Sequence, residues 1–223
     1  MSSPTWIVPR LWPDRTVFVI GGGPSIADTP LDLIHDYRSI GVNYAFALGD
    51  WVDVCWFGDA RFHRKHRKEL LAFPGLIATC CPALYRKGEL GVQVPPPGVR
   101  IIRKSPSRVI GIDSDPRFVC WNKNSGASAI NLAVHFGASR IVLLGFDMRQ
   151  SADGRNNYHS AHDSNPPATV YERRFLPVFP RIRADLDALG VECLNATPGT
   201  ELHEFPKVDL REWIEGERAK GTL

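Results

Sequence analysis

The chain has 223 residues, of which 43% are hydrophobic and 23% charged, as is usual for a globular protein with one sizeable core. Its formal net charge of +3 at pH 7 is too small to indicate nucleic-acid or membrane binding by itself. No apolar run reaches membrane-spanning length, and we expect no signal peptide because the N-terminus lacks a basic region followed by an apolar one. The five cysteines form no C-x-x-C pair, which favours a reducing compartment, and we expect the cytoplasm.

The first predicted element is a buried strand over residues 16–20, and a glycine-rich loop follows it directly. The loop consists of Gly21, Gly22, Gly23, Pro24 and Ser25. Glycines let a ligand approach the backbone, and Ser25 or Thr29 is suited to cap a following helix. A strand that ends in such a loop at a helix start predicts an anion site. The loop matches neither G-x-G-x-x-G nor the Walker A pattern, and the alternative is that its glycines serve turn geometry alone.

Helices and strands then alternate along the chain. In order, we expect a short helix at 30–36, strands at 38–43 and 53–57, a helix at 61–72 and a strand at 76–80. After these come a buried helix at 127–136, a strand at 140–145, a helix interrupted by two prolines at 169–189, a strand at 191–194 and a helix at 209–220. This alternation predicts a single α/β domain over residues 1–223, with a doubly wound, Rossmann-like parallel sheet.

Two segments fall outside the regular pattern. Residues 1–15, with two tryptophans and three prolines, predict an irregular arm laid on the body of the protein. Residues 81–121 are dense in proline, glycine and arginine, and so long an irregular stretch predicts an insertion or a lid.

The predicted helix at 61–72 begins with a strongly basic run, Arg61 to Lys68. A solvated helix face is the simplest interpretation of such a run. The alternative is a face that binds phosphates or an acidic acceptor.

Polar residues recur where the predicted strands end. They are Ser25, Asn43, Asp59, Asp147 and Asn195. In open α/β sheets the ligand crevice lies at this edge, so we expect the site there.

A second concentration of polar residues lies in the loop from 147 to 164. His159 and His162 are three residues apart, and a histidine is the natural general base for a hydroxyl. Arg155 and Tyr158 are suited to stabilise a leaving phosphate. The alternatives are an idle solvated loop, or a metal held by His159, His162 and Asp163, whose spacing fits no standard site. We expect no metal.

Six motifs in a fixed order resemble one family. They are Gly-Gly-Gly-Pro-Ser-Ile (21–26), Val-Asn-Tyr-Ala-Phe (42–46), Asn-Ser-Gly (124–126), Ile-Val-Leu-Leu-Gly-Phe-Asp (141–147), His-x-x-His (159–162) and Cys-Leu-Asn-Ala-Thr-Pro-Gly (193–199). Over residues 16–205 the chain resembles the small bacterial α-2,3/α-2,8 sialyltransferases. It also resembles their wider relatives, the DUF115 group, which includes archaeal hydroxymethylpterin pyrophosphokinases. Short proteins with this pattern also occur in phage and prophage genomes.

The resemblance implies a nucleotide-binding α/β domain with a lid, a CMP-sugar donor, inversion at the anomeric centre and no metal. The loop Gly21–Ser25 and Asn43 would hold the nucleotide. The donor pocket would be lined by Asn124, Ser125 and Gly126. His162 would be the base that deprotonates the acceptor hydroxyl.

The chain departs from that family at two points. The sialyltransferases have an asparagine where this chain has Gly22, and the lack of that side chain removes one nucleotide contact. Their longer loop carries two tyrosines for the leaving phosphate, whereas this loop has only Tyr158, so Arg149 or Arg155 would have to substitute.

Three functions remain open from the sequence. The first is a metal-independent glycosyltransferase that uses a nucleotide-sugar donor and a hydroxyl acceptor, with His162 as base. The second is ATP-dependent pyrophosphoryl transfer, for which Asp59 and Asp147 would hold Mg²⁺. The third is a non-catalytic phage protein that binds a nucleotide, or nucleic acid through the basic run. The sequence leaves the oligomeric state open.

Overall fold

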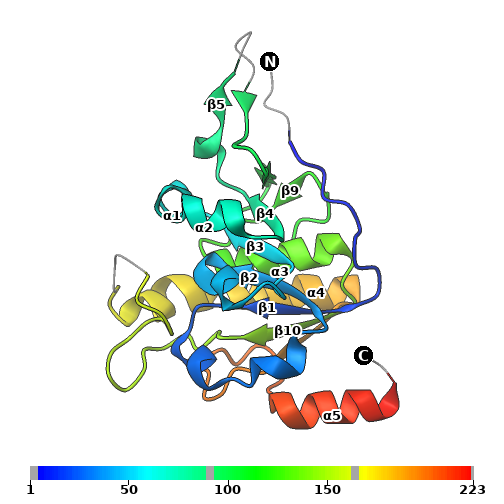
Figure 1. The fold of residues 1–223 in the computed structure, drawn as a ribbon. Coiled ribbons are helices and arrows are strands. Elements are labelled where there is room, and N and C mark those ends of the chain that lie inside the picture. Colours follow the sequence, from blue (N-terminus) through cyan, green and yellow to red (C-terminus); the bar gives the residue numbers. More distant parts are fainter. Residues whose placement is uncertain (1–4, 89–92, 162–165, 222–223) are drawn as a thin grey trace.

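The computed structural model describes residues 5–88, 93–161 and 166–221 (Figure 1). Its centre is a parallel sheet of seven strands in the order β11-β10-β1-β2-β3-β4-β7. The strands are β1 (Thr16–Ile20), β2 (Arg38–Val42), β3 (Val54–Phe57), β4 (Leu76–Thr79), β7 (Val99–Ile101), β10 (Arg140–Leu144) and β11 (Glu192–Asn195). The predicted fold, a doubly wound parallel α/β sheet, is confirmed.

The order of the strands reverses beside β1. The chain runs outward from β1 through β2, β3 and β4 to β7, and then returns to β10 on the other side of β1. The register pairs Val17 with Ile141 on β10 and with Arg38 on β2. In such sheets the loops that leave the two central strands diverge at this point and open a crevice.

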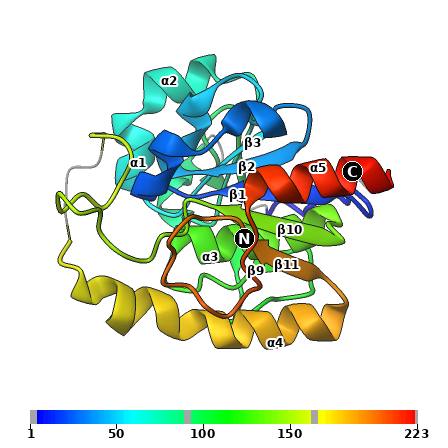
Figure 2. The same cartoon turned by 90° about the horizontal axis from the view of Figure 1, so that it is seen from below.

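Helices cover both faces of the sheet (Figure 2). On one face, β1 residues Val17 and Val19 pack in one core with α3 (Ser125–Phe136) and α4 (Phe179–Leu189). On the other face, Phe18 and Ile20 pack with α5 (Leu210–Lys220), and the neighbouring strands with α1 (Ala60–Lys65) and α2 (Arg67–Ala72). Successive side chains of a strand point to opposite faces, so each strand serves both layers and must be apolar throughout.

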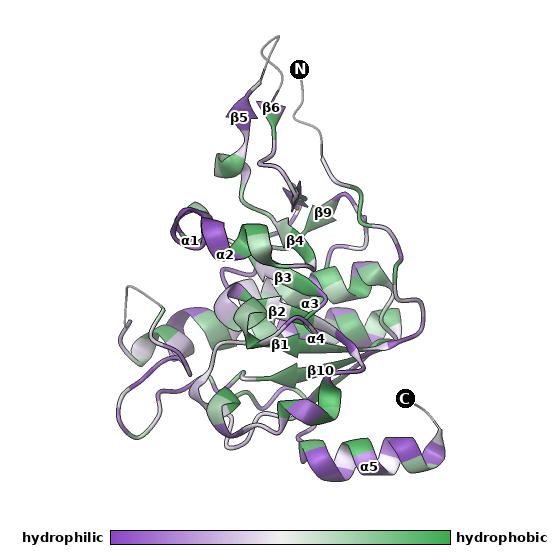
Figure 3. Ribbon diagram, viewed as in Figure 1, coloured by the Kyte–Doolittle hydropathy of each residue, from purple (hydrophilic) through white to green (hydrophobic). Residues whose placement is uncertain are grey.

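The distribution of apolar residues follows these layers (Figure 3). The central strands and α3 are hydrophobic, whereas α5 alternates between hydrophobic and hydrophilic residues. Asp209 caps α5 by accepting the N–H of Glu212 at 3.0 Å, and Ile214 is its buried contact with the sheet. An amphipathic pattern of this kind is typical of a helix that covers one side of a core.

Short elements connect the main ones. The helical turns are η1 (Pro24–Asp28), η2 (Leu31–Ile34), η3 (Asn43–Leu48), η4 (Pro82–Leu84), η6 (Tyr171–Phe175) and η7 (Leu176–Val178). Two small strand pairs are β5 (Arg86–Lys87) with β6 (Gln93–Val94) and β8 (Arg103–Lys104) with β9 (Phe118–Val119).

Three predicted helices differ from the observed ones. The stretch 30–36 forms only the 3₁₀ turn η2, and no α-helix follows the glycine loop. The helix predicted at 61–72 is broken at His66, whose φ of −103° and ψ of 21° separate α1 from α2. The stretch 169–189 begins with the π-helical turn η6 and the 3₁₀ turn η7, and only α4 is regular. Prolines at 177 and 180 lack the N–H that a continuous helix needs.

The region 81–121 belongs partly to the body of the domain. It supplies β7 to the edge of the main sheet, and Ile102, Ile112 and Val119 are buried in the core that contains α3. Asn131 on α3 holds this region in place, because its Oδ1 accepts the N–H groups of Asp113 and Cys120, both at 2.9 Å. The interpretation that part of this region acts as a lid stays a prediction.

The described part of the N-terminal arm, residues 5–15, lies on the body, as the sequence predicts. Trp6 donates its N–H to Ile101 O at 2.9 Å, and Trp12 donates its N–H to Phe136 O at 2.7 Å. The Trp12 and Phe136 rings are 4.4 Å apart. All five cysteines are free and buried. Throughout residues 5–88, 93–161 and 166–221, every helix is too short or too polar to cross a bilayer.

Candidate functional site

A cavity of about 550 Å³ opens at the carboxyl edge of the sheet, where the strand order reverses. The loops after β1, β2, β3 and β10 and the N-terminus of α3 form its walls. Its volume lies in the range of pockets that bind small molecules. Ten residues that the sequence predicts for the site line it: Gly21, Gly22, Gly23, Asn43, Asp59, Asn124, Ser125, Gly126, Asp147 and His159.

The three loop glycines have different reasons to be glycine. A Cβ on Gly23 would lie 1.8 Å from Asp147 Oδ2, and one on Gly21 would lie 2.5 Å from Gly145 O. These two positions therefore serve the close packing of the loops after β1 and β10. A Cβ on Gly22 would instead lie 3.0 Å from Asn157 Oδ1 and 4.0 Å from His159 Nε2. Gly22 is thus the loop glycine whose missing side chain leaves room toward the polar loop over the cavity.

Asp147 ties the two central loops together. Its Oδ1 accepts the N–H of Ser25 at 3.0 Å and its Oδ2 accepts the Ser25 hydroxyl at 2.8 Å. Burial raises the pKa of Asp147, and the two hydrogen bonds from Ser25 oppose that rise. Ser25 and Pro24 do not line the cavity, so Ser25 acts here as a structural partner of Asp147.

Two α-helices begin at the cavity, the short α1 after Asp59 and the longer α3 after Asn124. The glycine loop leads only into the 3₁₀ turn η1, which lacks the dipole of a long helix. Asn124 caps α3, since its Oδ1 accepts the N–H groups of Gly126 at 2.8 Å and Ala127 at 3.3 Å. Lys123 stands directly before this cap on the cavity wall. The positive end of the helix dipole and a lysine therefore meet at one point of the cavity.

Backbone strain is concentrated at the cavity. Five non-glycine residues of the described chain have positive φ, and three of them line the cavity: Asn43 (52°), Lys123 (53°) and Met148 (53°). Left-handed backbone is unfavourable for residues with a Cβ, and such strain clusters at functional sites. This observation is independent of the motifs.

The cavity wall carries an excess of positive charge. Its cationic residues are Arg61, Lys65, Lys123, Arg149 and Arg174, and its carboxylates are Asp59 and Asp147. Both oxygens of Asp147 accept hydrogen bonds from Ser25, and Asp59 caps α1 by accepting the N–H of Arg61 at 2.7 Å. The two carboxylates suggested as Mg²⁺ ligands are therefore both engaged in the fold. The potential of the cavity favours an anionic ligand.

One wall of the cavity consists of aromatic and histidine rings. The Tyr44 ring lies 4.9 Å from the rings of both His66 and His159. His66 is buried, with Nδ1 3.4 Å from a carboxylate oxygen of Glu69. His159 Nδ1 accepts the N–H of Ala161 at 3.1 Å, which places the proton of the neutral ring on Nε2. His66 therefore has the carboxylate partner that a general base needs, whereas His159 is arranged as a donor.

Two residues suggested for the leaving phosphate lie away from the cavity lining. The Tyr158 hydroxyl donates to Tyr44 O at 3.3 Å, and its ring packs against the core beneath the glycine loop. Burial raises the pKa of Tyr158. Arg155 is exposed and donates from Nε to Asp153 Oδ2 at 2.6 Å. His162, the suggested base, lies outside the described residues. Asn195 turns inward, where its Nδ2 donates to Leu202 O at 3.3 Å.

The structure brings other residues to the cavity that the sequence did not indicate. Tyr171 and Arg174 of η6 line it, and the Tyr171 hydroxyl donates to Asn156 Oδ1 at 2.7 Å. Burial and the nearby Asp147 charge raise the pKa of Tyr171 to about 12, so the phenol remains a donor at neutral pH. The side chains of Tyr171 and Arg174 therefore reach the cavity from the same π-helical turn. Nothing in the sequence shows that this turn borders the site.

No family model and no curated protein sequence matches the chain. Among solved structures, the chain is similar to the sialyltransferase CstII from Campylobacter jejuni, solved in complex with a substrate analogue, cytidine-5'-monophosphate. The TM-score is 0.52 at 12% sequence identity, and the match covers 87% of this chain and 84% of CstII. The chain thus shares its fold with a sialyltransferase, whereas the resemblance to the DUF115 and phage proteins rests on the motifs alone.

Proposed function

We propose that the protein is a metal-independent glycosyltransferase that transfers a sugar from a nucleotide donor to a hydroxyl acceptor. The observation that carries this proposal is the net positive cavity at the reversal of strand order, bounded by Gly22 and by the N-terminus of α3. The CMP complex of the structural neighbour supports a nucleotide as the ligand. The motif resemblance favours a CMP-linked donor.

The nucleotide would bind between the two central loops and α3. The backbone of the glycine loop, Asn43 and the segment 124–126 would contact it, with its phosphate at the helix N-terminus beside Lys123. Five cations around the cavity would then supply the charge that a divalent metal supplies in other transferases. This is the physical basis for expecting transfer without a metal.

In the reaction, the acceptor oxygen forms a bond to the anomeric carbon while the bond from that carbon to the phosphate oxygen breaks. The nucleotide leaves with the electron pair, and the acceptor proton passes to a histidine. We assign stabilisation of the leaving phosphate to Tyr171, Arg174 and Arg149, because these residues line the cavity and Tyr158 and Arg155 do not.

Two histidines are candidates for the base. The motif resemblance favours His162. His66 is the alternative within the described residues, because it lines the cavity and has Glu69 beside Nδ1. A carboxylate at Nδ1 orients an imidazole and stabilises its charged form.

The test measures, by chromatography, the release of free nucleotide from CMP-, UDP- and GDP-sugars in the presence of EDTA. We expect His162→Ala to lower the rate by on the order of 100-fold or more, while CMP binding stays unchanged. His66→Gln is the matched variant. If only this variant releases nucleotide more slowly than wild type, His66 is the base. Equal activity of wild type and both variants contradicts a histidine base, and no release from any donor contradicts the transferase.

A further inference from the structure

Charge is distributed unevenly along this nearly neutral chain. Residues 60–108 contain eleven arginines and lysines but two glutamates, whereas the other residues contain sixteen basic and twenty-two acidic ones. Residues 60–108 form α1, α2, β4, the β5–β6 pair, β7 and the start of the following segment, at the end of the sheet where β7 is the edge strand. This is the cyan-to-green part in the upper half of Figure 1. One flank is therefore strongly positive, and the rest of the molecule is net negative.

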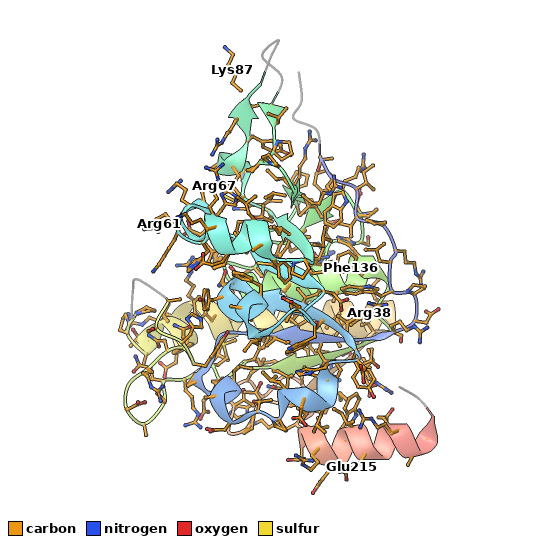
Figure 4. All side chains as sticks on the ribbon, viewed as in Figure 1. Arg38, Arg61, Arg67, Lys87, Phe136 and Glu215 are labelled. Atoms are coloured by element: carbon orange, nitrogen blue, oxygen red, sulfur yellow. The ribbon has the colours of Figure 1, made fainter. Side chains whose placement is uncertain are left out.

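Five exposed cations form the outer part of this flank, which we call the basic face. They are Arg64, Arg67, Lys68, Arg86 and Lys87. Among the described residues, no carboxylate lies within ion-pair distance of any of them. Figure 4 shows Arg61, Arg67 and Lys87 along the same side of the molecule. The described part of the fold therefore does not neutralise the charge of this face.

A small pocket of about 50 Å³ lies within the basic face. His63, Arg67 and Arg86 line it together with Leu71 and two prolines, Pro96 and Pro97. Burial, and then the charges of Arg67, Arg86 and Arg64, lower the pKa of His63. The guanidinium groups are therefore close enough to repel a further positive charge. An anionic group in this pocket would relieve that repulsion.

The basic face leads to the large cavity. Arg61 and Lys65 line the cavity. Lys68 lies in α2, beyond the break at His66, whereas Arg64 follows Arg61 by three residues within α1. Residues at that spacing are neighbours on a helix surface. The cations of the basic face therefore continue toward the cavity through Arg64 and Arg61.

We propose that the basic face binds an acidic oligosaccharide, and that this oligosaccharide is the acceptor, with its terminal hydroxyl in the cavity. The acceptor role rests on the proposed function. The large apolar side chains exposed on the described part of the flank are Leu71 and Val94, so the face offers no exposed aromatic ring for stacking bases. Charge without stacking platforms favours an acidic glycan over a single-stranded nucleic acid, and a glycan also carries the hydroxyl that transfer requires.

The test is the affinity of a fluorescent heparin octasaccharide, measured by anisotropy for the full chain. We expect Arg64→Ala/Lys68→Ala to weaken binding on the order of tenfold, because polyanion affinity depends on the number of cations in contact. Neither residue lines the cavity, so the CMP-induced rise in melting temperature should not change. The matched control is Arg15→Ala/Arg211→Ala, which removes two exposed cations outside the flank and should bind as wild type.

The outcomes separate this proposal from the transferase. Equal loss of octasaccharide affinity in both double variants, or loss in neither, overturns the proposal that the basic face binds the glycan. Tighter binding of a 20-base-pair DNA than of the octasaccharide, lost in the same variant, overturns the glycan in favour of nucleic acid. If the octasaccharide binds through Arg64 and Lys68 but no nucleotide binds, the result supports glycan binding by the basic face and contradicts the proposed transferase activity.

Discussion

At the scale of single residues, the glycine loop combines two requirements in three positions. Gly21 and Gly23 allow the loops after β1 and β10 to pack together, since a Cβ on either would overlap backbone or the Asp147 carboxylate. Gly22 faces the loop that carries Asn157 and His159. Glycine for geometry and glycine for ligand access are therefore both present, at neighbouring residues.

This division predicts opposite results for two alanine substitutions. Gly23→Ala should lower the free energy of unfolding by about 2–4 kcal/mol, because its Cβ has no room. Gly22→Ala should change that free energy by less than about 1 kcal/mol and weaken CMP binding, because its methyl group lies toward the cavity. Urea unfolding and a CMP titration measure the two quantities. Equal destabilisation by both substitutions would refute the division.

The sequence predicted part of the site at this scale. Motif residues such as Asn43, Asn124 and Asp147 line the cavity because they directly follow strands or start a helix, and those positions are fixed by the topology. Tyr171 and Arg174 were not predicted, since their orientation depends on how η6 packs against the sheet. Tyr158 does not line the cavity, since one turn of backbone decides whether its ring faces the core, and its suggested role at the leaving phosphate stays a prediction.

At the scale of elements, α3 organises both the cavity and the region 111–120. Its N-terminus carries the Asn124 cap at the cavity, and its middle holds the adjacent region through Asn131. Near its C-terminus, His135 Nε2 donates to Phe118 O at 2.7 Å. Burial lowers the pKa of His135 from its ordinary value of 6.5, and the hydrogen bond to Phe118 opposes this.

The buried His135 predicts the pH dependence of stability. Since the folded state prefers the neutral ring, this contribution is complete above pH 6.5 and is lost as the pH falls through the lowered pKa of the folded protein. His135→Gln keeps a donor for Phe118 O without the titration. It should flatten the decline in melting temperature between about pH 7.5 and about pH 5.5. An equally steep decline in the variant would show that His135 does not contribute.

The sequence predicted strands better than helices. Each main-sheet strand except β7 coincides with a predicted strand to within two residues, because a strand buried on both faces is a continuous apolar run. β7 has three residues inside a proline-rich segment, which is too short to be distinguished. The helices at 30–36 and 61–72 were predicted too regular, because single-sequence patterns do not show where a turn tightens to 3₁₀ or a helix breaks. For 169–189 the interruption was predicted from its two prolines, but the π-helical turn η6 was not.

At the scale of the whole molecule, strand order and charge distribution point to the same edge. The reversal beside β1 opens the cavity, and the flank formed by residues 60–108 brings cations to its mouth. The alternation of strands and helices was sufficient to predict the doubly wound sheet. The charge segregation is visible in the sequence, but its meaning depends on the folding of α1, α2 and β5 onto one side.

The central claim is that the cavity binds a nucleotide without a metal, and a thermal-shift measurement tests it most directly. The protein is heated with CMP, UDP, GDP, ADP and ATP, each with and without Mg²⁺. We expect CMP without Mg²⁺ to raise the melting temperature by about 5–10 °C at a hundredfold excess over its Kd, and Gly22→Ala to reduce that rise. Stabilisation by ATP with Mg²⁺ alone, or by no nucleotide at all, would contradict the account.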